Sequence, residues 1–233
     1  MKDKLQFYIN GSWVDSESNE KIEVINPANE EIIGHVTAGT KGDIDRAVAA
    51  AFQAFSSFQY TSKDERIELL NSIISEYENR YDDFVQAISE EMGAPLWLSE
   101  KAQASTGIKN IHETLDALKD YQFEKPEGDY TLIKEPIGVI GMITPWNWPM
   151  NQITTKVSAA LAAGCTMVLK PSEISPYCAM LLAEVFDAAG VPDGVFNVVN
   201  GYGPTVGAAL SEHPDIAMMS FTGSTRAGIA VAQ

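Results

Sequence analysis

The chain has 233 residues, of which 45% are hydrophobic and 21% are charged, with 32 Asp and Glu against 16 Lys and Arg. This composition provides enough apolar side chains for a packed core, and it argues against a disordered chain or a membrane protein. The formal net charge of -16 would repel nucleic acid and anionic lipid, so neither is expected as a partner.

The charges are distributed unevenly along the chain. Residues 1–140 carry 13 basic and 26 acidic side chains, whereas residues 141–233 carry three basic and six acidic ones. We therefore expect a solvated hairpin and helical layer over residues 1–120, an extended arm over 121–136, and a buried α/β part over 137–233. With only two cysteines, both in apolar segments, and no apolar leader at the start, we expect a reducing cytoplasm as the location.

The first 120 residues predict a hairpin, a strand and four helices. Asn10-Gly11 lies between apolar runs in residues 7–14, which favours a type I′ turn, and residues 22–25 predict another strand. Asp43 is the expected N-cap of the first helix. The apolar face of that helix is expected to hold Ile44, Val48, Ala51, Phe52 and Phe55. Further helices are predicted over residues 64–79, 81–92 and 96–118.

The segment 121–136 is extended and polar, with a short strand predicted over residues 130–133. It is either an arm that pairs with another subunit or a surface linker, and the pattern alone does not separate the two.

From residue 137 onward, apolar strands alternate regularly with helices. Strands are predicted over residues 137–143, 166–169, 195–199 and 216–219, and helices over 150–163, 176–189, 205–210 and from 224 on. Repeated βα units with continuously apolar strands predict a doubly wound parallel sheet in the α/β class. Because the sequence stops at Gln233 inside the fourth helix, we expect an incomplete sheet that requires a C-terminal part or a partner.

Ligands of doubly wound sheets bind beyond the carboxyl ends of the strands, so the four loops that follow the strands are the candidate site. Lys170 and Glu173 could both hydrogen-bond the hydroxyls of a ribose; alternatively, Lys170 is exposed and Glu173 is a first-turn helix charge. Gly223 and Ser224 suit a phosphate at a helix N-terminus, although a plain serine cap explains them equally well.

Two further loops carry weaker signals. The glycines Gly201, Gly203 and Gly207 are spaced one residue too long for a dinucleotide fingerprint, so a tight turn before a helix is the better interpretation. Asn147 stands between two tryptophans and two prolines, where its amide could donate to an oxyanion; a turn asparagine between two core tryptophans is the alternative.

Taken together, these motifs resemble the NAD(P)-dependent aldehyde dehydrogenase superfamily, in its order and spacing, over essentially the whole chain. The matching segments are Ile143-Thr144-Pro145-Trp146-Asn147-Trp148-Pro149, Lys170-Pro171-Ser172-Glu173, Gly190-Val191-Pro192-Asp193-Gly194-Val195-Phe196-Asn197, Gly201-Tyr202-Gly203-Pro204 and Phe221-Thr222-Gly223-Ser224-Thr225. In the front part they are Tyr8-Ile9-Asn10-Gly11, Asn26-Pro27-Ala28 and Glu135-Pro136-Ile137-Gly138.

The resemblance implies a role for each matching residue. Asn147 would be the catalytic amide that stabilises the oxyanion, and Trp148 and Gln152 would line the tunnel of a small aldehyde substrate. The cofactor would be NAD, with NADP as the other possibility. Ile143, Thr144, Pro145 and Trp146 would run along the cofactor, and Lys170, Ser172 and Glu173 would hold the adenosine ribose. Gly203 would flank the adenine, and Phe221, Gly223, Ser224 and Gly228 would surround the pyrophosphate. Glu173 should repel a 2′-phosphate, which favours NAD.

In this family a cysteine thiolate attacks the aldehyde and a glutamate assists hydrolysis of the resulting thioester, and neither position exists in these 233 residues. Cys165 and Cys178 are interpreted as buried apolar residues, and the scattered His35, His112 and His213 predict no metal site.

The resemblance thus implies the cofactor-binding N-terminal half of an aldehyde dehydrogenase, inactive alone, which forms a homo-oligomer or pairs with a complementing C-terminal half. One alternative is a non-catalytic nucleotide-binding or assembly fragment of an interrupted gene. Another is a non-hydrolytic relative that makes an acyl-CoA or reduces an acyl phosphate.

Overall fold

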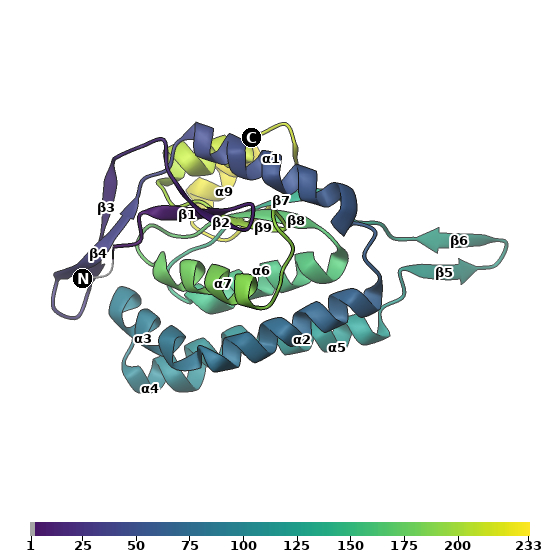
Figure 1. The fold of residues 1–233 in the computed structure, drawn as a ribbon, viewed down its shortest axis with the longest axis horizontal. Coiled ribbons are helices and arrows are strands. Elements are labelled where there is room, and N and C mark those ends of the chain that lie inside the picture. Colours follow the sequence, from purple (N-terminus) through teal and green to yellow (C-terminus); the bar gives the residue numbers. More distant parts are fainter. Residues whose placement is uncertain (1–2) are drawn as a thin grey trace.

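A six-stranded sheet forms the centre of the computed structural model, which describes residues 3–233. Its strand order is β10-β7-β8-β9-β1-β2. The strands β7 (Val139–Ile143), β8 (Thr166–Lys170), β9 (Phe196–Val198) and β10 (Ile216–Phe221) are parallel, which confirms the predicted βα pattern. Helices cover the sheet on both faces (Figure 1).

The N-terminal hairpin belongs to this sheet instead of lying apart from it. Strands β1 (Gln6–Ile9) and β2 (Ser12–Asp15) are antiparallel, and Tyr8 in β1 pairs with Val198 in β9. The φ angles of 53° at Asn10 and 72° at Gly11 agree with the predicted type I′ turn. Buried Asn197 holds this turn, because its Oδ1 accepts from Asn10 N at 3.0 Å while its amide donates to Met167 O and Gly194 O. The sheet is therefore mixed.

Two buried clusters lie on opposite faces of the sheet, as the alternation along β8 shows. Met167 and Leu169 belong to the larger cluster, which includes α6 (Pro149–Ala163) and α7 (Tyr177–Ala188), whereas Val168 packs with α1 (Lys41–Phe58) and α8 (Ala208–Ser211). An outer layer of α2 (Lys63–Asn79) and α5 (Ser105–Asp120) packs on α6 (Figure 1).

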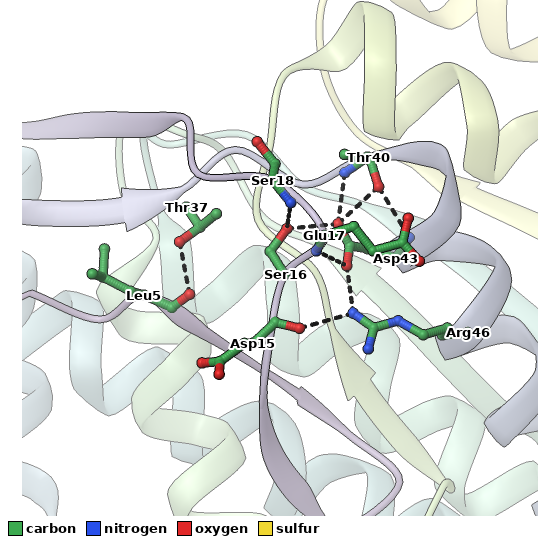
Figure 2. Close-up of polar contacts among 9 residues, drawn as sticks. All are labelled: Leu5, Asp15, Ser16, Glu17, Ser18, Thr37, Thr40, Asp43 and Arg46. Carbon is green, nitrogen blue, oxygen red and sulfur yellow. Dashed lines mark hydrogen bonds and ion pairs between the residues drawn. The ribbon is translucent and has the colours of Figure 1, made fainter.

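The start of α1 differs from the prediction, because its N-cap is Thr40 and Asp43 is the third helical residue. The two form a capping box, and the buried Asp43 carboxylate also accepts from Ser16 Oγ at 2.8 Å and from Arg46 Nη2 at 2.6 Å (Figure 2). Burial alone would raise the pKa of Asp43, but hydrogen bonds from Thr40, Arg46 and Ser16 outweigh burial and hold that pKa below its usual value. The apolar face is also narrower than predicted, since Phe52 is 58% exposed.

The remaining front elements agree with the prediction apart from one missed strand and one helix irregularity. Helix α3 (Tyr81–Met92) ends at Gly93, whose φ is 78°. The predicted helix over residues 96–118 consists of α4 (Leu96–Leu98), a π-helical segment η1 (Ser99–Ala104) and α5. Strand β3 (Lys21–Asn26) pairs with β4 (Glu31–Thr37), which was not predicted.

The arm predicted over residues 121–136 contains a hairpin of β5 (Glu124–Glu127) and β6 (Tyr130–Ile133) that projects from the body of the molecule (Figure 1). All four residues of β6 are exposed. Elsewhere, a π-helical turn η2 (Gly203–Gly207) precedes α8, and α9 (Thr225–Ala232) follows β10. Within residues 3–233 no helix has the length and apolar character needed to cross a bilayer.

Candidate nucleotide site at the carboxyl ends of the strands

Three of the four candidate loops begin side by side at one edge of the sheet. Ile143, the last residue of β7, is in register with Lys170 of β8 and with Phe221 of β10. The loops stay connected one residue further on, because Thr144 N donates to Lys170 O at 3.3 Å and Thr222 N donates to Ile143 O at 3.1 Å. Strand pairing therefore places three of the predicted cofactor residues next to one another.

The loop after β8 contains a buried ion pair. The Lys170 side chain is only 4% exposed, and its Nζ lies 3.0 Å from Glu173 Oε2 and 2.9 Å from Pro171 O. The alternative in which Lys170 is solvent-exposed is therefore wrong. Ser172 is buried as well, and its Oγ accepts from Ile174 N at 3.3 Å, which fixes the turn. Glu173 keeps 35% of its side chain exposed, so this end of the ion pair is accessible from solvent.

Glu91, which the sequence pattern did not single out, holds the point where this loop ends and α7 begins. Glu91, in the last turn of α3, is fully buried, and its carboxylate accepts from Tyr177 N at 2.6 Å and from Cys178 N at 3.0 Å, the first residues of α7. Burial raises the pKa of Glu91 to about 7, although the hydrogen bonds from Cys178 and Tyr177 oppose the rise. The available signal was its spacing, because Glu91 continues the buried stripe of Phe84 and Ile88 at helical intervals.

The loop after β9 passes over the strand ends through η2. A Cβ atom added to Gly207 would lie 3.6 Å from Ile143 Cδ1 and 4.0 Å from Lys170 Cδ. At Gly203 an added Cβ would meet no atom of the described residues within 4 Å, so this glycine borders open space. The turn-before-helix interpretation of these glycines is supported, and the turn lies directly above the pair formed by β7 and β8.

The loop after β10 ends in a serine-capped helix. Ser224 is the N-cap of α9, and its Oγ accepts from Ala227 N at 3.2 Å, so a plain cap accounts for this side chain. The Phe221 ring packs over the following glycines, because an added Cβ would lie 2.5 Å from its Cζ at Gly223 and 3.3 Å from its Cε1 at Gly228. A larger residue at either position would displace that ring.

The loop after β7 is the most open of the four. Trp146 is 47% exposed, which overturns the interpretation of both tryptophans as core residues; Trp148 is half-buried and is the N-cap of α6. Asn147 is exposed, and its side chain makes no hydrogen bond within the described part of the chain. Thr144 differs, since its buried Oγ1 has no hydrogen-bond partner among residues 3–233. Gln152 lies one turn into α6, partly exposed, and its backbone N–H donates to Trp148 O.

Both cysteines are buried, as predicted, with exposures of 1% for Cys165 and 0% for Cys178. Burial, together with the neighbouring Glu91 carboxylate, raises the pKa of the Cys178 thiol well above its usual value. Neither thiol is therefore suited to act as a nucleophile. No group of three or more His, Cys, Asp or Glu side chains within residues 3–233 is placed to hold a metal ion.

Comparison with known proteins shows extensive similarity. The model of the "Aldehyde dehydrogenase family" matches residues 13–233. A relative from Staphylococcus aureus strain USA300, whose name places it among the aldehyde dehydrogenases, is 56% identical over 228 residues, which cover 98% of this chain and 48% of that protein.

Solved structures agree with this result. An aldehyde dehydrogenase from Bartonella henselae is 48% identical with a TM-score of 0.98, over 100% of this chain and 50% of that one. A C291A variant of aldehyde dehydrogenase C from Pseudomonas syringae, in complex with NAD+ and octanal, is 48% identical with a TM-score of 0.97, over 98% and 47% of the two chains. The chain thus spans about half the length of the relatives that it matches.

Proposed function

Because this chain belongs to the aldehyde dehydrogenase family, we propose that it provides the NAD-binding part of an enzyme that converts an aldehyde and water to a carboxylate. The observation that carries the proposal is the buried Lys170–Glu173 pair, flanked in register by Ile143 and Phe221 at the carboxyl edge of the sheet. When bound, the nicotinamide of NAD would accept the hydride of the aldehyde.

The adenosine end would be held by the loop after β8. Lys170 would donate to one ribose hydroxyl and Glu173 would accept from the other, with Ser172 fixing the turn that carries them. Gly203 would leave room for the adenine, since it borders open space. Thr144 Oγ1, buried and without a partner among residues 3–233, offers a hydrogen-bonding group to a ligand that runs past the end of β7.

The pyrophosphate would lie against the N-terminus of α9. The exposed backbone N–H groups after Gly223 and Ser224 would donate to it, and the Phe221 ring over Gly228 would form the wall beside it. Ile143, Pro145 and Trp146 would contact the ligand along the loop after β7. Two family members with known structures, from P. syringae and S. aureus, were solved with NAD+, which is consistent with this choice of nucleotide.

NAD is favoured over NADP by the charge at the ribose. The Lys170 ammonium is already paired with Glu173, and the partly exposed carboxylate of Glu173 would repel a 2′-phosphate.

The aldehyde would bind at the start of α6. Asn147 would donate its amide to the developing oxyanion, and Trp148 and Gln152 would line the entry. Because the thiols of Cys165 and Cys178 are both buried, the nucleophile would come from the part of the relatives that this chain does not span, and these 233 residues alone would not oxidise aldehydes.

Assembly would involve the exposed arm. Tyr130, Leu132 and Ile133 in β6 are 67%, 45% and 57% exposed. Neighbouring exposed apolar side chains are typical of a surface that contacts another protein, and an isolated two-stranded hairpin is only marginally stable. We propose that this hairpin pairs with another subunit or with a complementing C-terminal half. A non-catalytic nucleotide-binding fragment is the second candidate function, and the two buried cysteines favour it.

Titration calorimetry with NAD and NADP tests the nucleotide site. We expect NAD to bind more tightly than NADP, and Glu173→Gln to weaken NAD binding by about 10-fold or more while reducing the preference over NADP. Glu113→Gln, an exposed carboxylate on α5, is the matched control and should leave binding unchanged. A folded chain that releases no binding heat with NAD, or a Glu173→Gln variant that binds as tightly as the wild type, contradicts the site.

Activity separates the two candidate functions. Mixing the chain with the remaining half of the 56% identical S. aureus relative and an aldehyde should produce NADH if the chain is part of an enzyme. NAD binding without NADH production in the mixture would favour the non-catalytic alternative.

A further inference from the structure

The dipeptide Asn-Gly occurs twice in the chain, in opposite surroundings. Asn10-Gly11 forms the turn between β1 and β2, where Asn10 is exposed, whereas Asn200-Gly201 follows β9, where Asn200 is 1% exposed. In this dipeptide the backbone nitrogen of the glycine can attack the side-chain amide carbon of the asparagine, because glycine has no side chain that blocks the approach. The two sites therefore share one reactive sequence but differ in their freedom to react.

The side chain of Asn10 is free to move. Within residues 3–233 its amide makes no hydrogen bond, and only its backbone N–H is held, by Asn197 Oδ1 at 3.0 Å. The turn lies at the edge of the sheet opposite β10, and no residue of β2 is buried. Rotation of Asn10 into a reactive conformation thus requires the opening of an edge turn only, which local fluctuations provide.

The second site is fixed by packing. The backbone carbonyl of Asn200 accepts from Gly39 N at 2.9 Å, and its side-chain amide donates to Met180 Sδ at 3.4 Å. A Cβ atom added to Gly201 would collide with the side chain of Val206 in η2, so the peptide has no room to turn. Reaction there requires the opening of the interior between β9 and η2.

We propose that Asn10 is a site of deamidation, while Asn200 stays intact in the folded chain. The Gly11 nitrogen bonds to the side-chain carbonyl carbon of Asn10, the bond from that carbon to Nδ2 breaks, and ammonia leaves with the proton that Gly11 has lost. Water then opens the five-membered ring at one of its two carbonyls, which gives aspartate or isoaspartate. No electrons are transferred and water is the only co-reactant, so the step is independent of the proposed NAD site.

The modification changes the turn in two ways. Both products add a carboxylate next to Asp193, which lies so close to Gly11 that an added Cβ would collide with its carboxylate, so like charges are brought together. Isoaspartate also lengthens the main chain by one carbon, and Ile9 and Ser12 can then no longer close a two-residue turn. Deamidation should therefore loosen β1 and β2 from β9.

Ageing of the wild-type chain tests the proposal. The protein is incubated at pH 8, folded or in urea, and peptide mass spectrometry follows the conversion of each asparagine to its acid. In the folded chain we expect Asn10 to react at least about 10-fold faster than Asn200, because the buried site must first open. In urea the two rates should become similar. The proposal is overturned if Asn200 reacts as fast as Asn10 in the folded chain, or if Asn10 reacts in urea but stays intact in the folded chain.

A variant tests the effect on the hairpin. Asn10→Gly has no amide to lose, and Gly-Gly suits the same turn type. Amide hydrogen exchange is compared before and after ageing. We expect exchange in β1 and β2 to become faster in the aged wild type and to stay unchanged in aged Asn10→Gly. Unchanged exchange in a wild type whose Asn10 has been converted would contradict the loosening. The comparison of the two asparagines uses only the wild type, so it does not depend on the folding of the variant.

Discussion

Strands β8 and β10 both end in predicted cofactor loops, yet their surroundings differ sharply. All five residues of β8 are buried between β7 and β9, whereas β10 is an edge strand with no buried residue. The same contrast continues into the loops, since Lys170 is almost completely buried whereas Gly223 and Ser224 are exposed. The proposed ribose contacts are thus preformed by packing within this chain, while the proposed pyrophosphate contacts rest on a capped helix at the open edge.

Two methionines allow this contrast to be measured with the same change, methionine to alanine, in each strand. Met167 in β8 is 0% exposed, and Met218 in β10 is 43% exposed. We expect Met167→Ala to lower the free energy of unfolding by about 2–5 kcal/mol and Met218→Ala by less than about 1 kcal/mol, because only the first leaves a cavity. Urea unfolding followed by circular dichroism measures both. Equal losses would mean that β10 is as well packed as β8.

Glu91 tests whether the loop after β8 is held from below. Its pKa is about 7 in the folded chain against an ordinary value of 4.5, so its contribution to stability is fully present below pH 4.5 and is lost as the pH rises through 7. Relative to Glu91→Gln, which does not titrate, the wild type should lose on the order of 3 kcal/mol of unfolding free energy over that interval. Urea unfolding at pH 5, 6, 7 and 8 measures the difference.

The exposed Glu113 provides the control for this experiment, and Glu113→Gln should follow the wild-type pH profile. Parallel profiles for the wild type and Glu91→Gln would show that the buried carboxylate does not titrate in this range. A loss of unfolding free energy with rising pH that disappears in Glu91→Gln but persists in Glu113→Gln would tie the pH dependence to the α3–α7 contact beneath the loop.

Asp43 anchors the helix that covers the centre of the sheet but not its edge. Helix α1 packs on β8, where Thr166 Oγ1 donates to Ala51 O at 2.8 Å, and Asp43 joins its first turn to Ser16 (Figure 2). We expect Asp43→Asn to lower the unfolding free energy by about 2 kcal/mol at pH 7, since hydrogen bonds to a charged group are lost.

The pH dependence of the Asp43 effect has the opposite sign to that of Glu91. Because the pKa of Asp43 is lowered on folding, its contribution is present above its ordinary value of 3.8 and is lost as the pH falls. The wild type and Asp43→Asn should therefore converge in acid, as measured by thermal unfolding. Asp45→Asn, on the exposed side of the same helix turn, should cost less than about 0.5 kcal/mol; an equal cost would argue against the buried network.

Local signals predicted the elements well wherever turn chemistry or capping fixed their ends. Helix α3 was predicted with its observed limits because Gly93 adopts a left-handed conformation that a glycine readily takes, and the Asn10-Gly11 turn was predicted because both residues tolerate positive φ. The N-cap of α1 was misplaced because Thr40 and Asp43 are both good capping residues and lie three positions apart.

Contacts between distant segments could not be predicted from pattern. The sequence left Lys170 equally consistent with an exposed and a buried position, and only the packing of β8 between two strands and beneath η2 decides between them. Glu91 and Tyr177 are 86 residues apart, and the pairing of Tyr8 with Val198 joins opposite ends of the chain. Such contacts depend on the tertiary arrangement, which a single sequence does not encode in any local spacing.

The substitution Ser224→Ala has the smallest expected effect, and it tests the exposed loop between β10 and α9. The Ser224 hydroxyl caps α9, so its removal should destabilise that helix by about 1 kcal/mol. No residue of α9 is buried, so we expect this loss to appear as faster amide hydrogen exchange in α9, with little change in global unfolding. Exchange measured by mass spectrometry should show α9 affected while β8 is unchanged. If the substitution instead lowered the global unfolding free energy by the full amount, α9 would unfold together with the sheet, and the edge and the centre would form one cooperative unit.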